Sequence, residues 1–128
     1  MKQGPILFIG LGSIGQRHLR NIRALLGWEV KIIAVRVDGK APLLNEAREV
    51  IPDRSIESEY DVIQCNSLAQ AIAMGPTAAF ICNPSSEHFG VLEQTLSAGV
   101  PTFVEKPIVT NFEDLKILET VVADEHPR

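Results

Sequence analysis

The stretch Pro5-Ile6-Leu7-Phe8-Ile9-Gly10-Leu11-Gly12-Ser13-Ile14-Gly15 carries the strongest fold signal in this chain. Its first half is continuously apolar, which is typical of a strand buried on both faces of a parallel sheet. Its second half has the spacing G-x-G-x-x-G and opens a segment, 13–26, whose apolar residues recur at helical spacing. A buried strand, a glycine turn and a helix in this order form the first unit of a doubly wound α/β fold.

Each glycine of this turn has a separate physical role. Gly10 permits the tight turn, Gly12 removes a side chain where a pyrophosphate must approach the backbone, and Gly15 lets the helix pack closely on the strand. The free N–H groups around Ser13 and Ile14 and the positive end of the helix dipole then face the phosphates. The alternative is a glycine-rich turn without a ligand, but such a turn needs one or two glycines rather than three in this order. We therefore expect these five residues to bind a dinucleotide.

Strand and helix signals alternate along the rest of the chain. Short apolar segments at 30–35, 60–65, 77–82 and 101–104 predict strands, and the segments between them predict helices. This alternation predicts parallel strands joined by right-handed helical crossovers, with helices on both faces of the sheet. We expect one domain over residues 1–128, a Rossmann-type doubly wound parallel sheet with three layers, α/β/α.

Several local patterns carry more specific expectations. Capping boxes at 67–70 and 110–113 predict the starts of two later helices. Residues 43–50 could form a short helix, and the six carboxylates of segment 46–61 predict a solvated face. In the helix 13–26 the spacing predicts a buried face and a largely solvent-facing set of arginines. The buried set is Ile14, Leu19, Ile22 and Leu26, and the arginines are Arg17, Arg20 and Arg23.

The composition limits the class of protein. The chain has 128 residues, 45% of them hydrophobic, and a formal charge of -4 from 12 basic and 16 acidic residues. That length fits one domain, and the acidic balance argues against nucleic acid or an anionic membrane as partner. Two cysteines are too few for a disulfide scaffold and lack the paired spacing of a zinc site. Because no apolar segment suits secretion or membrane insertion, we expect a reduced, cytoplasmic protein.

The end of the second predicted strand carries an arginine where dinucleotide sites usually carry a carboxylate. An Asp or Glu about 20 residues after the glycines normally binds the ribose 2′-hydroxyl, whereas this chain has Arg36 there and Asp38 two residues later. An arginine cannot accept a hydrogen bond, but it can pair with a 2′-phosphate, which favours NADP over NAD. The alternative is that Arg36 stacks on the adenine ring while Asp38 holds the ribose, which would give NAD or dual use.

Two polar motifs follow the fourth and fifth predicted strands. Asn83-Pro84-Ser85-Ser86-Glu87-His88 follows the strand at 77–82, and Glu105-Lys106-Pro107 follows the strand at 101–104. Both lie at the carboxyl ends of strands, where doubly wound sheets bind ligands. Alone, a histidine in the first turn of a helix is usually a surface or capping residue, and a lysine before proline is usually solvated. Together with the glycine turn, the two motifs predict one shared site.

These motifs resemble the N-terminal half of the Gfo/Idh/MocA family (glucose–fructose oxidoreductase, inositol dehydrogenase and relatives). The similarity runs over nearly the whole chain and rests on the glycine turn with His18, on Pro84 with His88, and on Glu105-Lys106-Pro107. It implies an oxidoreductase that transfers hydride between a nicotinamide cofactor, NADP or NAD, and a sugar, cyclitol or related polyol. The family usually has Thr-Pro-Asn where this chain has Asn83-Pro84-Ser85.

The resemblance also implies roles for the later motifs. Lys106 would lie beside the nicotinamide and contact the reacting substrate oxygen, where an ammonium group stabilises developing negative charge. Pro107 would keep Lys106 out of helical backbone, and a cis Lys106–Pro107 bond is expected because relatives often show one. The residues expected to bind the cofactor, besides Lys106 itself, are Asn83, Pro84, Ser85, His88 and Glu105.

The resemblance further implies a C-terminal substrate domain, which is absent from this chain. We therefore expect the chain to bind dinucleotide weakly, to be inactive by itself, and to expose surface that could drive homo-oligomer formation. Two other function classes stay open: a dinucleotide-sensing regulatory module, which gives no reason for Glu105-Lys106-Pro107, and an interaction scaffold with a decayed site. His18 is expected to pack or cap locally, and Cys65 and Cys82 are expected to be small apolar core residues.

Overall fold

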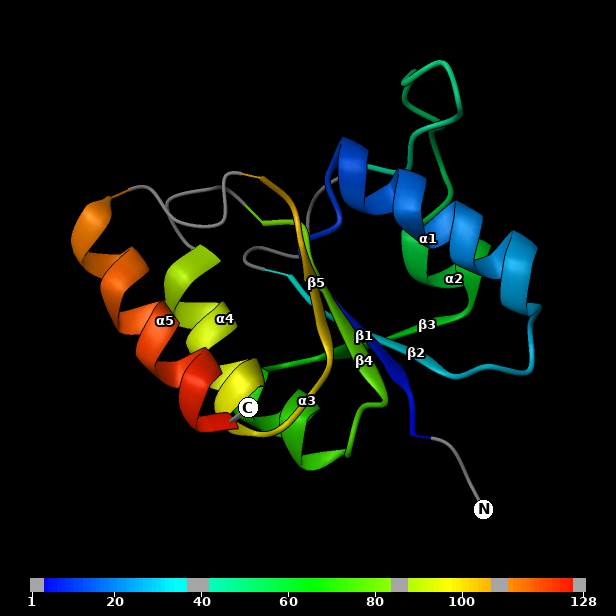
Figure 1. Ribbon diagram of the computed structural model, residues 1–128. Helices are drawn as coiled ribbons and strands as arrows, with labels where there is room; N and C mark the ends of the chain where they lie inside the picture. The colour runs from blue at the N-terminus through cyan, green and yellow to red at the C-terminus, as the bar shows by residue number, and fades with distance from the viewer. Residues whose placement is uncertain (1–3, 37–41, 84–87, 107–110, 126–128) are drawn as a thin grey trace.

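The computed structural model describes residues 4–36, 42–83, 88–106 and 111–125, with the side chains of the last helix described as far as residue 120. Strands and helices alternate along these residues (Figure 1). The elements are β1 (Ile6–Ile9), α1 (Ser13–Leu26), β2 (Ile32–Val35), α2 (Ile56–Tyr60), β3 (Val62–Cys65), α3 (Leu68–Ala73), β4 (Ala78–Ile81), α4 (His88–Ser97), β5 (Thr102–Val104) and α5 (Phe112–Glu125). None of the described helices is long and apolar enough to cross a membrane.

The strands form one parallel sheet in the order β3-β2-β1-β4-β5. The first strand lies at its centre, where Ile6 is in register with Ile32 of β2 on one side and with Ala78 of β4 on the other. The strand order therefore reverses between β1 and β4. This order confirms the predicted doubly wound parallel sheet, in which ligands bind outside the carboxyl ends of the strands at the point of reversal.

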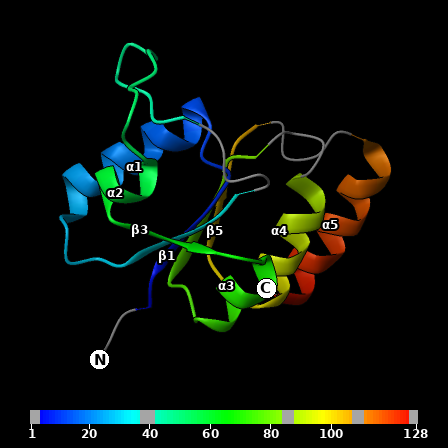
Figure 2. The same cartoon turned by 180° about the vertical axis from the view of Figure 1, so that it is seen from behind.

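Helices cover both faces of the sheet, with α1 and α2 on one face and α3, α4 and α5 on the other (Figure 1, Figure 2). Side chains alternate along β1, so this strand contributes to both cores. Leu7 and Ile9 pack into the core under α3, α4 and α5, whereas Ile6 and Phe8 pack into the core under α1 and α2. Burial on both faces explains why the sequence of β1 is continuously apolar.

The buried face of α1 differs from the expected one. Leu19 is buried and Ile22 is half-buried, as predicted, but Ile14 and Leu26 are exposed and Arg23 is buried. The Arg23 guanidinium donates hydrogen bonds to four backbone carbonyl oxygens, which replace the water that burial removes. These oxygens belong to Gly27, Val30, Tyr60 and Asp61. The prediction for Arg23 was wrong because helical spacing alone gives no information about such distant acceptors.

Residues 43–50 form no helix, contrary to the sequence-based expectation. Leu44 pairs with Val50 in an isolated antiparallel bridge, and the Asn45 side chain accepts hydrogen bonds from the N–H groups of Ala47 and Glu49. Asparagine competes with helix formation in this way, because its side chain satisfies nearby backbone donors in a turn. A helix, α2, forms instead at residues 56–60.

The two expected capping boxes have different outcomes. Ser67 caps α3 by accepting a hydrogen bond from the Gln70 N–H at 3.1 Å, which confirms the first prediction. The second cap lies one residue later than expected, since Asn111 accepts a hydrogen bond from the Asp114 N–H at 2.8 Å and α5 begins at Phe112. Asparagine ranks at least as high as threonine at this position, which accounts for the shift.

Candidate functional site

A cavity of about 930 Å³ lies at the carboxyl ends of β1, β2 and β4, where the strand order reverses. Residues that directly follow each of these strands contribute to its wall, and the first turns of α1 and the segment after residue 42 complete it. The lining residues are Gly10, Leu11, Gly12, Ser13, Ile14, Arg17, Arg20, Asn21, Arg36, Leu44, Asn45, Glu46, Arg48, Cys82 and Asn83. The cavity therefore has the position that ligands take in doubly wound sheets.

The three glycines of the turn meet different surroundings. A Cβ on Gly10, whose φ is 90°, would lie 2.7 Å from the Asn83 backbone nitrogen, and a Cβ on Gly15 would lie 2.4 Å from the Gly10 carbonyl oxygen. A Cβ on Gly12 would meet nothing within 4 Å. Gly10 and Gly15 thus allow close approach between parts of the protein itself, whereas Gly12 leaves its backbone open to the cavity.

The N-terminus of α1 points its free backbone donors at this cavity. Gly12 is the N-cap residue, and it has no side chain that could accept a hydrogen bond from the first turn of the helix. The first turn also contains no acidic residue that would neutralise the positive end of the helix dipole. Ser13 and Ile14, the first two helical residues, line the cavity. The amides of this turn therefore need an external acceptor, and an anion satisfies both them and the dipole.

Arginines dominate the charge of the cavity wall. Arg17, Arg20, Arg36 and Arg48 line it, and Glu46 is the one carboxylate among the described lining residues. A wall with this balance concentrates anionic ligands, because the positive field is focused inside a cleft. The cavity wall therefore carries net positive charge, although the chain as a whole has a formal charge of -4.

Gln16 fixes the glycine turn to the segment that follows β2, and sequence reasoning missed it. Its side-chain amide donates to the carbonyl oxygens of Leu11 at 3.0 Å and Pro42 at 2.9 Å, and its Oε1 accepts from the Leu44 N–H at 2.8 Å. These three bonds use both donors and the oxygen of a fully buried side chain, and they hold two walls of the cavity together. A lone glutamine in a helix gives no sequence signal for such a role.

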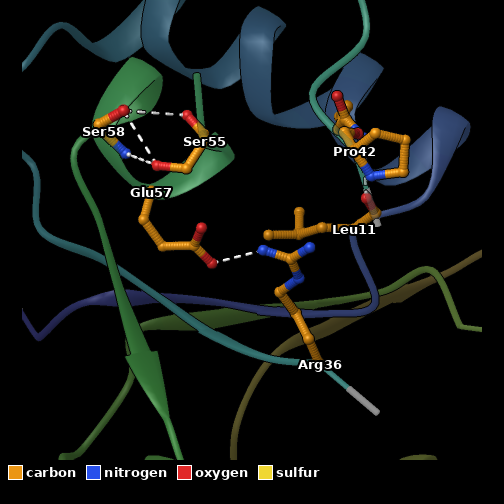
Figure 3. A network of polar contacts seen from close by, with 7 residues as sticks. Leu11, Arg36, Pro42, Ser55, Glu57 and Ser58 are labelled. Atoms are coloured by element: carbon orange, nitrogen blue, oxygen red, sulfur yellow. Dashed lines mark hydrogen bonds and ion pairs between the residues drawn. The ribbon is translucent and has the colours of Figure 1, made fainter. Parts of the chain in front are cut away.

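Arg36 follows β2 directly, as predicted, but its guanidinium is already in an ion pair. Its Nη1 lies 2.5 Å from the Oε2 of Glu57, which is carried by α2 (Figure 3). The Arg36 side chain is only 4% exposed. Asp38, the second candidate at this position, lies outside the described residues. The pairing of Arg36 with Glu57 was not anticipated, because the acidic segment 46–61 was expected to be a solvated face.

Asn83 brings an unsatisfied acceptor to the cavity from the end of β4. The residue is 8% exposed and lines the cavity, and its side-chain Oδ1 has no hydrogen-bond partner within the described part of the chain. A buried acceptor of this kind is costly unless a ligand donor or water reaches it, so it fits a bound hydroxyl or amide. His88 lies behind it, fully buried, with its Nε2–H donating to the Asn83 carbonyl oxygen at 2.8 Å. Pro84 and Ser85 lie outside the described residues.

Glu105 meets His18 rather than the cavity wall. The His18 Nε2 lies 2.5 Å from the Glu105 Oε2, and the His18 ring packs edge-on against Phe103 with centroids 5.2 Å apart. His18 therefore packs, as expected, but its polar contact joins α1 to the end of β5 and is not local. Burial, and secondarily the Glu105 carboxylate, raises the pKa of the nearby Cys82 thiol to about 12. Cys65 and Cys82 are both buried, as predicted.

Lys106 stands apart from the other predicted residues. It follows β5 and Glu105, is exposed, and does not belong to the cavity lining. The structure thus brings together the glycine turn, Arg36 and Asn83 around one cavity, with His88 supporting it from behind. Pro107, and with it the expected cis bond, lies outside the described residues.

Comparison with known proteins identifies relatives over nearly the whole chain. Residues 5–127 match the family GFO_IDH_MocA, described as "Oxidoreductase family, NAD-binding Rossmann fold". The chain is 31% identical over 118 residues to inositol 2-dehydrogenase of Gluconacetobacter diazotrophicus, a match that covers 90% of this chain and 32% of that protein. It is 27% identical to scyllo-inositol 2-dehydrogenase (NAD(+)) of Bacillus subtilis, covering 84% of this chain and 29% of that protein. The chain therefore spans about a third of the length of these relatives.

Solved structures share the fold. The scyllo-inositol dehydrogenase of Lactobacillus casei, solved with bound NAD(H) and scyllo-inositol, superposes with a TM-score of 0.71 at 25% identity, covering 97% of this chain and 34% of that one. A UDP-N-acetylglucosamine 3-dehydrogenase from Acidithiobacillus ferrooxidans superposes with a TM-score of 0.74 at 22% identity, covering 98% of this chain and 36% of that one.

Proposed function

Because this chain belongs to the Gfo/Idh/MocA oxidoreductase family and spans its NAD-binding Rossmann fold, we propose that it binds a nicotinamide dinucleotide in the cavity at the carboxyl ends of β1, β2 and β4. We propose further that the nicotinamide is presented there to a sugar, cyclitol or related polyol. The observation that carries the proposal is the opening at Gly12, where a cavity wall rich in arginine meets the uncapped N-terminus of α1.

The phosphate end of the ligand is supported by the backbone. The amides of Ser13 and Ile14 would donate to the diphosphate, and Gly12 would let the phosphates approach without a side chain in the way. Arg17 and Arg20 line the same wall and add positive charge. Gln16 would keep this turn in place, because its bonds fix the Leu11 carbonyl.

The reactive end of the ligand is supported by groups after β4 and β5. When bound, the nicotinamide supplies or accepts a hydride. Asn83 Oδ1, the buried acceptor without a partner, would accept a hydrogen bond from the dinucleotide, and the His88–Asn83 bond would hold that strand end in place. Pro84 and Ser85 would complete this segment. Lys106 would stabilise negative charge on the reacting substrate oxygen, with Glu105 orienting nearby groups.

The substrate class rests on the relatives. Two of them are named as dehydrogenases of inositol, a cyclitol, and this chain spans about a third of their length. We therefore assign turnover of a polyol or sugar to the longer protein and propose that this chain, by itself, binds the dinucleotide without turning it over. Dehydrogenase activity from residues 1–128 alone would contradict that assignment.

The choice between NADP and NAD is the finer part of the proposal and depends on the end of β2. The charge of Arg36 supports NADP, because a guanidinium pairs well with a 2′-phosphate. Its ion pair with Glu57 supports NAD, because that pair already satisfies part of the charge. Asp38 would hold the ribose hydroxyls in the alternative that gives NAD or dual use.

Calorimetric titration of the chain with NADH tests the proposal. Wild-type protein is expected to bind, and Gly12→Ala is expected to weaken binding at least about tenfold, because the new methyl group occupies the path of the pyrophosphate. Gly90→Ala is the matched control, since a Cβ there also meets nothing within 4 Å but lies on α4, outside the cavity lining. Absence of binding for both NADH and NADPH at millimolar concentration would overturn the proposed function.

A further inference from the structure

The ion pair between Arg36 and Glu57 lies at the edge of the cavity where the adenosine ribose of a dinucleotide would bind. We propose that Glu57 sets the choice between NAD and NADP through this pair, and that it disfavours NADP. The inference rests on the proposed function, because it concerns the ribose end of the same dinucleotide site. Glu57 is a positioning residue in this scheme: it is not among the cavity-lining residues and acts through Arg36.

The pair is built into the fold rather than formed by two mobile surface chains. Arg36 follows the last residue of β2, lines the cavity, and has a side chain only 4% exposed. Glu57 occupies the first turn of α2, where the Ser55 side chain accepts a hydrogen bond from the Ser58 N–H at 3.0 Å and fixes the start of the helix (Figure 3). Shielding from water makes the pair stronger than an ordinary surface ion pair.

The rest of the fold holds α2 in position to make this contact. The buried Arg23 of α1 donates hydrogen bonds to the carbonyl oxygens of Tyr60 and Asp61 at the end of α2, at 2.9 Å and 3.0 Å. Ile56, in the first turn of α2, is buried in the core under α1. Both ends of this short helix are thus anchored, and the Glu57 carboxylate is presented to β2 by a fixed element.

The charge of this arrangement discriminates between the two nucleotides. A 2′-phosphate carries close to two negative charges, so it would have to share the Arg36 guanidinium with the Glu57 carboxylate and accept repulsion from it. A 2′-hydroxyl carries no charge and pays no such penalty. The pair therefore lowers the affinity that Arg36 would otherwise give for NADP and leaves the affinity for NAD unaffected.

Removal of the Glu57 charge tests the inference. In calorimetric titrations with NADH and NADPH, the wild-type chain is expected to bind NADH more tightly. Glu57→Gln keeps the shape of the side chain but removes the carboxylate charge that competes with a 2′-phosphate for Arg36. The ratio of NADPH affinity to NADH affinity is therefore expected to rise about tenfold, the effect of one charge-assisted hydrogen bond. Thermal unfolding of the variant checks that its fold is intact.

The neighbouring glutamate provides a matched control. Glu59 lies on the same helix, pairs with an arginine, Arg54, and has a side-chain exposure of 30% against 27% for Glu57. Glu59→Gln makes the same change in net charge but leaves Arg36 untouched. Its effect on the affinity ratio is therefore expected to stay below about twofold, because neither Glu59 nor its partner Arg54 lines the cavity and charges farther from the ligand are screened by salt.

A double-mutant cycle shows whether Glu57 acts through Arg36. In an Arg36→Gln background, Glu57→Gln is expected to leave the ratio unchanged, because the group that it releases is gone. The inference is overturned if wild-type protein prefers NADPH, if Glu57→Gln changes the ratio less than twofold, or if its effect persists without Arg36. Binding of NADH with an unchanged ratio removes this inference alone, whereas binding of neither nucleotide removes the proposed function and the inference together.

Discussion

The two ends of the proposed dinucleotide site differ in how far contacts within this chain preorganise them. At the phosphate end, the glycine turn packs closely on α1 and on the end of β4, and Gln16 holds the turn to the segment after β2 by hydrogen bonds. Arg36 already has a carboxylate partner there. At the other end, the Asn83 Oδ1 is buried without a partner and Lys106 is exposed outside the cavity lining. The proposed phosphate end is therefore held in place by contacts within the chain, whereas the proposed reactive end has a buried acceptor without a donor and a lysine outside the lining of the cavity.

The largest effect is expected from damage to the phosphate end, at Gly15. A Cβ on Gly15 would lie 2.4 Å from the Gly10 carbonyl oxygen, which is backbone and cannot move without displacing β1. Gly15→Ala should therefore lower the free energy of unfolding by about 3 kcal/mol, a large part of the stability of a small domain. Urea unfolding followed by circular dichroism measures this change.

Gly90→Ala serves as the control for a helical glycine with open space, and it should be neutral or slightly stabilising. If Gly15→Ala unfolds at the wild-type urea concentration, the helix is not packed against the turn as described, and the contrast between the two ends weakens.

Features that local sequence patterns predict differ from those that depend on contacts between distant residues. The alternation of strands and helices, the glycine turn and the Ser67 cap follow from local patterns, because period, turn chemistry and capping act within a few residues. The burial of Arg23 and the pairing of Arg36 with Glu57 do not, because they join residues 21 to 38 positions apart. A single sequence contains no record of which distant polar groups meet.

The same reason explains the errors in the segment between β2 and β3. Its carboxylates look alike in the sequence, yet Glu57 faces Arg36 and Glu59 faces Arg54, whereas Asn45 uses its side chain to make a turn. The candidate site was predicted where its members share the strand ends. It was missed where a helix such as α2 brings a side chain from outside those motifs.

The next effect concerns Cys82, which follows β4 directly and lines the cavity next to Asn83. Burial, reinforced by the Glu105 carboxylate, raises its pKa from 9.0 to about 12, so the thiol stays protonated at physiological pH. Since the thiolate is the nucleophile, alkylation by iodoacetamide at pH 8.5 should be at least about a hundredfold slower for Cys82 than for an unfolded cysteine. Peptide mapping by mass spectrometry measures the rate at each cysteine.

The stability of the chain should follow the same shift. A folded-state pKa above the unfolded value of 9.0 contributes stability that is complete below pH 9 and is lost as the pH rises toward about 12. A Cys82→Ala variant should lose less stability than wild type over that interval. Rapid alkylation of Cys82 in the folded chain would show that the cavity wall at Cys82 is open to water.

The smallest effect on nucleotide binding is expected from substitution of Lys106. This substitution tests most directly whether the phosphate end and the reactive end have separate roles. Because Lys106 is exposed and outside the cavity lining, Lys106→Ala should change the affinity of this chain for NADH less than about twofold. In the longer protein, the same substitution should lower kcat by about 10² to 10³, because the ammonium group is proposed to act on the reacting oxygen and not on the cofactor phosphates. Lys116→Ala, on the exposed surface of α5, is the control for loss of a lysine charge.

A tenfold loss of NADH affinity in Lys106→Ala would show that this lysine contributes to nucleotide binding, and unchanged turnover in the longer protein would remove its catalytic role. Either result would mean that the reactive end is organised differently from the proposal, while the contacts around Gly12 and Gly15 would stand unaffected.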